Sequence, residues 1–238
     1  MENNIFYIPQ SSRYPNLKHG FSNRSDGSMH RHLEKENREV YFRKIGIDPY
    51  RVVTADLVHG TKVVRVSDEA AGTMIGSTDA LVTNIKNLFV SVTGADCFPL
   101  YLCDPIHKAV GIAHVGWKGL VGGVVTNMVV EMAQAFGAVP HMLVVGIGPG
   151  IRQCHFEVKP ENTMFYRNYP GSVIEREGKV FVDIPKIMKA QLRELGAKES
   201  NIQDSESCTY CKEDEYFSFR RDKPKDVQVQ VGYIGLSL

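Results

Sequence analysis

The 238-residue chain has almost no net charge, a single tryptophan and no long hydrophobic run. Its 28 Lys and Arg against 27 Asp and Glu leave a net charge of +1, which excludes the strongly basic surface of a bulk nucleic-acid or membrane-surface binder. The short hydrophobic stretches exclude a membrane-spanning helix. The start, MENNIFYIP, lacks the basic and apolar segments of a signal peptide, so we expect a cytoplasmic protein.

Cysteine is also scarce, and its number is odd. The five residues are Cys97, Cys103, Cys154, Cys208 and Cys211. An odd count in a chain of this size favours reduced thiols over a disulfide framework. Cys103 falls in a predicted strand, and Cys154 falls in a turn without a near partner of metal-binding type. The pair Cys208-x-x-Cys211 lacks a second such pair or a histidine pair that would complete a zinc site, so we predict structural roles for these four cysteines.

The remaining composition is that of a globular protein, with 43% hydrophobic and 23% charged residues and no internal repeat. The length suits one domain over residues 1–238. Hydrophobic periodicity and terminal Pro or Gly residues predict three helices, over 30–46, 120–137 and 185–196. Clusters of β-branched residues between turns predict strands over 63–66, 80–83, 88–92, 100–103, 109–115, 142–147, 179–182 and 227–233. Because these elements do not alternate regularly, we predict an α+β fold with mixed β-sheets.

The segment TGADCFPLYLCDPIHKAVGIAHVGWKG, residues 93–119, brings a thiol and an imidazole close together in the sequence. It contains parts of three short predicted strands, 88–93, 99–103 and 109–115. If they form an antiparallel meander, Cys97 in the first turn and His114 at the end of the third strand reach the same sheet edge, about 10 Å apart at the backbone.

A second histidine, His59, precedes Gly60 between two β-rich runs, as a residue at a hairpin tip would. One cysteine and two histidines form a three-ligand zinc set that leaves a fourth position for water or substrate. No short motif ties His59, Cys97 and His114 together, so a structural role for both histidines stays open on this evidence.

Several stretches occur together in an order that resembles the laccase-domain family, also called multicopper polyphenol oxidoreductases. They are HGFSNR (19–24), VHGTKVVRV (58–66), TDALVT (78–83), GADCFPLYLCDP (94–105), GIAHVGWKG (111–119), GIGPGI (146–151), FEV (156–158) and SCTY with FSFRRD (207–222). The resemblance implies mixed β-sheets flanked by helices, similar to the cytotoxic necrotizing factor-type cysteine hydrolases. It also implies a zinc-dependent purine nucleoside enzyme with His59, Cys97 and His114 as metal ligands.

The implied reactions are phosphorolysis of adenosine, inosine or methylthioadenosine, adenosine deamination, or both. Zinc would lower the pKa of a bound water to about 7. The partners are then a small-molecule nucleoside and phosphate, with no nucleic acid and no membrane; the oligomeric state stays open, and a monomer is compatible. Copper is not expected, because eight histidines with one H-x-H pair, His30 and His32, do not suffice for a four-copper set.

Further residues are candidates for substrate contact or catalysis around the metal. The GWKG turn opens a predicted long helix, so that helix start and Lys118 could bind phosphate. Arg24 and Arg220, which Arg221 follows, are candidate substrate contacts. Asp96 could orient a ligand, act as a base or cap its own turn.

Two other functions fit the same residues. In a metal-free cysteine hydrolase or amidase, Cys97 would be the nucleophile and His114 the base. A non-catalytic binding protein would keep the fold without turnover.

Overall fold

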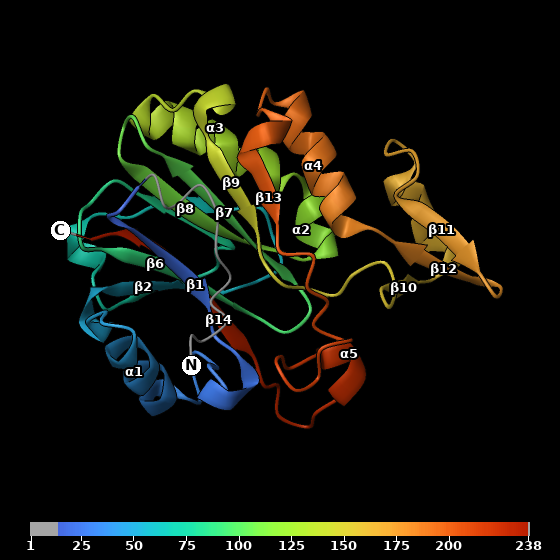
Figure 1. Ribbon diagram of the computed structural model, residues 1–238, viewed down its shortest axis with the longest axis horizontal. Helices are drawn as coiled ribbons and strands as arrows, with labels where there is room; N and C mark the ends of the chain where they lie inside the picture. The colour runs from blue at the N-terminus through green and yellow to red at the C-terminus, as the bar shows by residue number, and fades with distance from the viewer. Residues whose placement is uncertain (1–13, 238) are drawn as a thin grey trace.

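Two stacked β-sheets form the centre of the computed structural model, which describes residues 14–237 (Figure 1). The chain start, from which we expected no signal peptide, lies outside these residues. One sheet has five strands, in the order β1 (Leu17–Phe21), β14 (Gln230–Leu236), β6 (Phe89–Gly94), β2 (Val52–Ala55) and β4 (Met74–Ile75). In this sheet β2 runs parallel to both β6 and β4, whereas β14 is antiparallel to β1 and β6.

The second sheet has six strands and carries the densest part of the sequence. Its order is β13 (Ile202–Asp204), β9 (Val144–Ile147), β7 (Phe98–Asp104), β8 (Ala109–Val115), β5 (Ala80–Thr83) and β3 (Val63–Arg65). The pairs β13–β9 and β3–β5 are parallel and the others antiparallel. A small sheet of β10 (Glu157–Val158), β12 (Lys179–Val182) and β11 (Val173–Arg176) lies at one end of the molecule (Figure 1).

Five α-helices lie around these sheets in the described part of the chain. They are α1 (Lys35–Lys44), α2 (Trp117–Gly122), α3 (Val124–Phe136), α4 (Ile184–Glu194) and α5 (Phe219–Asp222). Asp183 caps the start of α4 by accepting from the backbone N–H of Lys186, and Pro185 follows in its first turn. None of the helices in residues 14–237 is long and apolar enough to cross a membrane.

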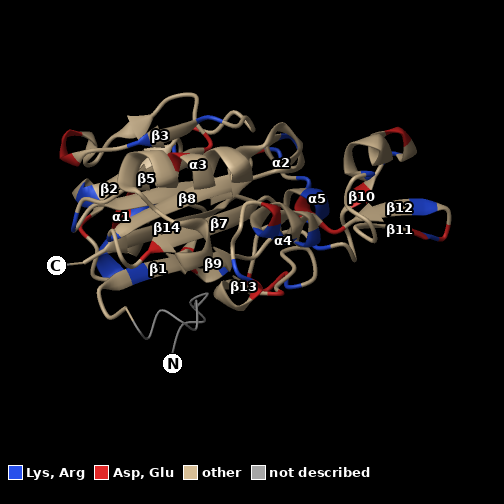
Figure 2. Ribbon diagram, turned by 90° about the horizontal axis from the view of Figure 1, so that it is seen from above, with Lys and Arg blue, Asp and Glu red and all other residues tan. Residues whose placement is uncertain are grey.

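The buried side chains form a helix–sheet–sheet–helix arrangement. Residues such as Val90 and Ile234 of the first sheet and Tyr101 and Ile112 of the second share one hydrophobic cluster, which packs the two sheets face to face. The outer face of the six-stranded sheet packs against α3 and α4, and that of the five-stranded sheet against α1. Acidic and basic residues are interspersed along the ribbon (Figure 2). The predicted α+β fold with mixed sheets is confirmed; its similarity to the cysteine hydrolases stays a prediction.

Two predicted helices differ in extent from those observed. The segment 120–137 is not one helix, because Gly123 adopts a left-handed φ of 98° that ends α2 and starts α3. Gly137, also left-handed, ends α3 as predicted. The segment 30–46 is helical only over α1, since residues 31–33 form a turn.

The predicted meander is wrong in its first member. Strand β6 does not pair with β7; it joins the other sheet between β14 and β2. Every residue of both strands is buried, which suits the interior of two stacked sheets rather than a meander with one exposed face. The chain thus crosses from one sheet to the other at 94–98, and Cys97 lies in that crossing.

Candidate metal centre and adjoining cavity

His59, Cys97 and His114 meet at one point although they come from three separate segments. Each offers one ligand atom, and the three atoms lie within 4.8 Å of one another. The rings of His59 and His114 are nearly perpendicular, with centroids 4.9 Å apart. The structure therefore brings together the three residues that the sequence suggested.

Cys97 and His114 are neighbours because β7 and β8 pair directly. Phe98 is opposite Val115 and Pro99 is opposite His114, so the residue just before β7 lies beside the end of β8. One strand spacing separates the two backbones, rather than the two spacings that the meander required. The shared sheet edge was predicted correctly, but for a partly wrong reason.

One ring nitrogen of His114, Nε2, is free to coordinate a metal ion. Its Nδ1 lies 2.9 Å from the carbonyl oxygen of Thr93, and because a carbonyl only accepts, Nδ1 carries the hydrogen. Nε2 then holds a lone pair, and this buried atom has no hydrogen-bond partner. A metal ion satisfies such an atom, and the hydrogen bond at Nδ1 fixes the required tautomer.

The space between the three side chains exists because residue 116 is glycine. A Cβ atom added at Gly116 would lie 3.0 Å from Sγ of Cys97, 3.3 Å from Cδ2 of His59 and 3.7 Å from Nε2 of His114. Two imidazoles and a thiol around such a gap fit a zinc ion with one open coordination position.

His59 is held by a buried carboxylate that the sequence analysis did not single out. Asp79, with no exposed surface, accepts the backbone N–H of Val58, His59 and Gly60 at 3.3, 2.8 and 2.7 Å. These bonds hold His59 at a left-handed φ of 57°. The predicted hairpin tip is wrong, because the turn connects β2 of one sheet to β3 of the other.

Asp79 also reaches the second histidine, since its carbonyl oxygen accepts the backbone N–H of His114 at 2.7 Å. One residue therefore fixes both histidine backbones. The sequence did contain a signal for this role. Asp79 directly precedes the apolar strand ALVT, where burial of a carboxylate without hydrogen-bond partners would cost free energy.

The surroundings of Cys97 and His114 favour the neutral forms of these two ligands in the absence of a cation. Burial raises the pKa of the Cys97 thiol to about 12, and the carboxylates of Asp96 and Asp79 add to this effect. Burial, with His59 nearby, lowers the pKa of His114 to about 4. Without a metal, the site near pH 7 pairs a protonated thiol with a neutral imidazole, unlike the activated thiolate of a cysteine hydrolase.

The three ligands open into a cavity of about 410 Å³. This volume lies within the range of roughly 300–1,000 Å³ typical of small-molecule sites. Its apolar wall includes Trp117, Phe156 and Phe219. Two cationic side chains, Arg31 and Arg220, also line it.

Asp96, predicted as a ligand-orienting residue or base, lines the cavity and holds the neighbouring segment 209–220 through hydrogen bonds. Its Oδ1 accepts from the Thr209 hydroxyl and its Oδ2 from the backbone N–H of Arg220, both at 2.7 Å. Its carbonyl accepts from the N–H of Ile151 at 2.8 Å, and its φ is 85°. With both carboxylate oxygens accepting from the segment 209–220, Asp96 positions that segment beside Cys97.

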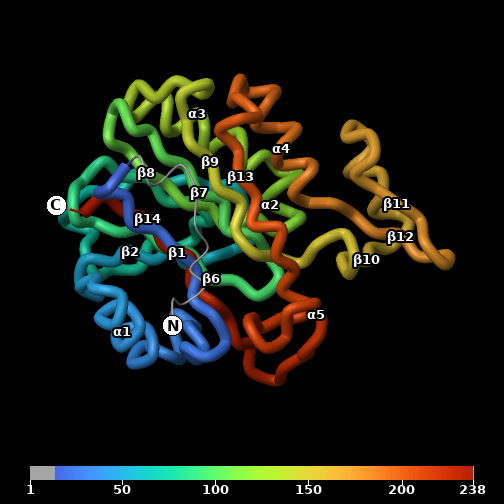
Figure 3. The backbone as a smooth tube through the Cα atoms, viewed as in Figure 1, coloured from blue at the N-terminus to red at the C-terminus, as the bar shows by residue number. Residues whose placement is uncertain are grey.

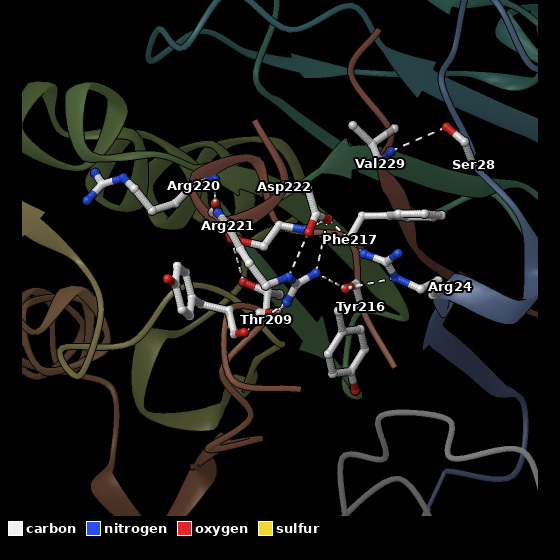
Figure 4. Close-up of polar contacts among 12 residues, drawn as sticks. Arg24, Ser28, Thr209, Tyr216, Phe217, Arg220, Arg221, Asp222 and Val229 are labelled. Carbon is white, nitrogen blue, oxygen red and sulfur yellow. Dashed lines mark hydrogen bonds and ion pairs between the residues drawn. The ribbon is translucent and has the colours of Figure 1, made fainter. Parts of the chain in front are cut away.

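Of the two arginines predicted to contact substrate, Arg220 lines the cavity and Arg24 does not. The Arg220 side chain borders the cavity and donates to the carbonyl of Glu157 at 3.0 Å. Arg24 does not line the cavity; its guanidinium pairs with Asp222 at 2.7 Å and covers the ring of Phe217 (Figure 4). Arg221 points away from Arg220 and donates to backbone carbonyls of the same loop (Figure 4).

Lys118 is also outside the cavity lining, with its Nζ 5.8 Å from the centre of the Trp117 ring. The predicted long helix after GWKG is the six-residue α2, because Gly123 interrupts it. The start of α2, Gly116 and Trp117, does line the cavity, and phosphate binding there stays a prediction.

Comparison with known proteins identifies the family. The family model described as multi-copper polyphenol oxidoreductase laccase matches residues 16–236. The chain belongs to this laccase family. The resemblance expected from the sequence motifs is thereby confirmed.

Relatives of this laccase-family chain carry an enzyme name. Purine nucleoside phosphorylase LACC1 of Mus musculus is 34% identical over 67% of this chain and 38% of that protein, so the chain spans about two fifths of that relative. Purine nucleoside phosphorylase ORF3 of Streptomyces griseus is 37% identical over 79% of this chain and 76% of that protein. The crystal structure of YlmD from Geobacillus stearothermophilus matches with a TM-score of 0.88 and 26% identity, over 94% of this chain and 93% of that one.

The expectation that no ligand set forms around Cys154, Cys208 and Cys211 is wrong. Cys154, Cys208 and Cys211 gather with His155, and their ligand atoms all lie within 4.8 Å of one another. The sequence signal was present, because His155 follows Cys154 directly and this pair, combined with Cys208-x-x-Cys211, makes four ligands. Cys103, by contrast, is buried in β7 between the sheets, as predicted for a core residue.

Proposed function

We propose that the chain is a zinc-dependent purine nucleoside phosphorylase that acts on adenosine, inosine or methylthioadenosine, with adenosine deamination as a second reaction of the same site. The observation that carries this proposal is the convergence of His59, Cys97 and His114 at the cavity, with Nε2 of His114 unpartnered. The names of the laccase-family relatives, both purine nucleoside phosphorylases, support the phosphorolytic reaction.

When bound, zinc would supply a Lewis acid and, for deamination, a water with a pKa of about 7. The remaining roles belong to the protein. The aromatic side chains of Trp117, Phe156 and Phe219 offer apolar surface for a purine. Arg220 offers a guanidinium for phosphate, which must reach C1′ as the bond from C1′ to the base breaks. Arg31, also at the cavity, has its Nε paired with Asp56 at 2.7 Å, so Arg220 is the better candidate.

The decisive experiment incubates the zinc-loaded protein with adenosine, inosine and methylthioadenosine, with and without phosphate. Phosphate-dependent release of the free base supports phosphorolysis, and phosphate-independent conversion of adenosine to inosine supports deamination. Absence of product from all three nucleosides, with zinc bound at His59, Cys97 and His114, would overturn the proposal.

Two matched variants locate the phosphate. Arg220→Gln keeps the backbone N–H that donates to Asp96 and removes only the guanidinium at the cavity. We expect it to raise the KM for phosphate by about 10-fold or more, which corresponds to the loss of one charge-assisted contact of about 1.4 kcal/mol or more. Lys118→Gln, outside the cavity lining, should leave that KM unchanged. The reverse result would assign phosphate to the start of α2.

The alternative of a metal-free cysteine hydrolase is less well supported, because the raised pKa of Cys97 and the lowered pKa of His114 both oppose a thiolate–imidazolium pair. Iodoacetamide labelling separates the two functions. Rapid labelling of Cys97 in metal-free protein at pH 7 would favour the hydrolase.

We also propose a cytoplasmic location, since both ligand clusters use reduced thiols.

A further inference from the structure

We propose that Cys154, His155, Cys208 and Cys211 bind a second, structural zinc ion that fixes one wall of the cavity. The cluster is independent of the proposed function, since none of these four residues lines the cavity. Cys154 and His155 follow β9, and Cys208 and Cys211 follow β13. These two strands lie side by side as a parallel pair (Figure 3), so their carboxyl ends deliver both segments to the same edge of the sheet.

The spacing of the ligand atoms is compatible with a tetrahedral metal site, since all four atoms lie within 4.8 Å of one another. Sγ of Cys154 lies 3.6 Å from Sγ of Cys208 and 3.6 Å from Sγ of Cys211, and Sγ of Cys211 lies 3.3 Å from Nδ1 of His155. A tetrahedral zinc ion with Zn–S bonds of about 2.3 Å and a Zn–N bond of about 2.0 Å spaces two sulfurs about 3.8 Å apart, and a sulfur and a nitrogen about 3.5 Å apart. The four side chains are thus arranged around a common centre.

The ligand types select zinc and a closed site. Three thiolates and one imidazole form a Cys₃His set, which fills all four positions and leaves none for substrate. Soft thiolate ligands disfavour magnesium, calcium and manganese. A disulfide would use only two of the three thiols, and it would leave the third thiol and the converging imidazole without a role.

Surrounding contacts hold the ligands in this arrangement. The ring of His155 stacks on Tyr210, with centroids 3.9 Å apart and planes 12° from parallel. The backbone N–H of Arg152 donates to Sγ of Cys208 at 3.5 Å, a contact that stabilises a thiolate. The Arg152 guanidinium makes two hydrogen bonds to Asp204, at 2.6 and 3.0 Å, which tie the two ligand-bearing segments together. Such outer contacts are a regular part of metal sites.

The cluster is connected to the cavity through Thr209, which lies between its two C-terminal cysteines. The Thr209 hydroxyl donates to Asp96, whose other carboxylate oxygen holds the backbone of Arg220. Arg221 donates to the carbonyls of Thr209 and Tyr210, both at 2.8 Å (Figure 4). A zinc ion at this position would therefore fix the segment that sets Asp96 and Arg220 beside Cys97.

The test counts zinc in full-length protein purified under reducing conditions and treated with excess zinc followed by desalting. We expect two zinc ions per chain in the wild type, one in Cys211→Ser and one in His155→Ala. Cys211 is exposed, so its substitution should leave the fold intact. Loss of a direct ligand should weaken zinc binding by more than the roughly 10–100-fold typical of outer-shell changes. Cys103→Ala, a thiol outside both clusters, should retain two ions.

A second measurement assigns each ion to its site. His114→Ala should also hold one zinc ion, and cobalt substitution of that variant should give the strong thiolate charge-transfer absorption of a Cys₃His site. Cys211→Ser that still binds two ions, or wild type that binds a single ion lost in His114→Ala, would overturn the proposal. So would a disulfide between Cys154 and Cys208 that persists under these reducing, zinc-replete conditions. Failure of the nucleoside assays with two ions bound would refute the proposed function alone.

Discussion

Gly116→Ala should damage the first metal centre while leaving the rest of the protein folded. Gly116 has φ of −86° and ψ of 167°, which alanine adopts without strain, so the effect comes from the added methyl group alone. That methyl would lie 3.0 Å from Sγ of Cys97 and 3.3 Å from Cδ2 of His59, closer than ordinary packing contacts. Both ligands must then move apart by a few tenths of an ångström.

The magnitude follows from the cost of overpacking, which is about 1–3 kcal/mol. If about 2 kcal/mol of this cost is incurred when the ligands close around zinc, the affinity falls by roughly 30-fold. The free energy of unfolding of the metal-free protein should fall only by the remainder of that cost, about 1 kcal/mol or less.

A competition titration against a zinc-binding dye measures the affinity, with the second site already filled, and thermal unfolding measures stability. Gly76→Ala is the matched control, because a Cβ there has no heavy atom within 4 Å and the residue is not left-handed. If Gly116→Ala binds zinc with an affinity within about three-fold of the wild type, the gap at residue 116 is not the metal position.

Three further variants test the same description. Asp79→Asn should reduce zinc affinity at the first centre by about 10–100-fold without emptying the second site, because an amide cannot accept all three N–H groups of the His59 turn; zinc counting and circular dichroism check this. Cys97→Ala should abolish zinc binding at that centre and turnover, with an unchanged unfolding midpoint in the presence of chelator. Asp204→Asn should lower the free energy of unfolding by about 3 kcal/mol at pH 7, by leaving Arg152 and Lys189 without their buried carboxylate.

The Asp204 variant also carries a pH dependence with a definite sign. Burial acts to raise the pKa of Asp204, but the hydrogen bonds and charge of Arg152, the backbone N–H of Glu206 and the hydrogen bond from Lys189 together hold the pKa below its usual value. A depressed pKa contributes stability above the unfolded value of about 3.9 and loses it as the pH falls through the folded value. Urea unfolding from pH 7 to pH 2 should therefore show a gap between wild type and Asp204→Asn that closes below about pH 4; a gap independent of pH would contradict this assignment.

Local features of the molecule were predictable from the sequence, and long-range pairings were not. The helix α4 could be identified from Pro185 and Gly196, and the β7–β8 hairpin from its short turn. The strand β6 was misplaced because its uniformly apolar residues suit the interior of either sheet. No local pattern indicates that β2 and β3, which are consecutive strands, belong to different sheets, so the position of His59 could be inferred only through the family resemblance.

The two clusters differ in the property that separates catalytic from structural zinc. The first has three ligands, a buried Nε2 without a partner and an adjoining cavity, so a bound ion would keep a position for water or substrate. The second has four ligands and lines no part of that cavity. Asp96 connects them, because it precedes the Cys97 ligand and accepts a hydrogen bond from Thr209 within the second cluster. Occupancy of the closed site should therefore affect the geometry of the open one, and loss of the second ion should lower turnover even where the first ion is retained.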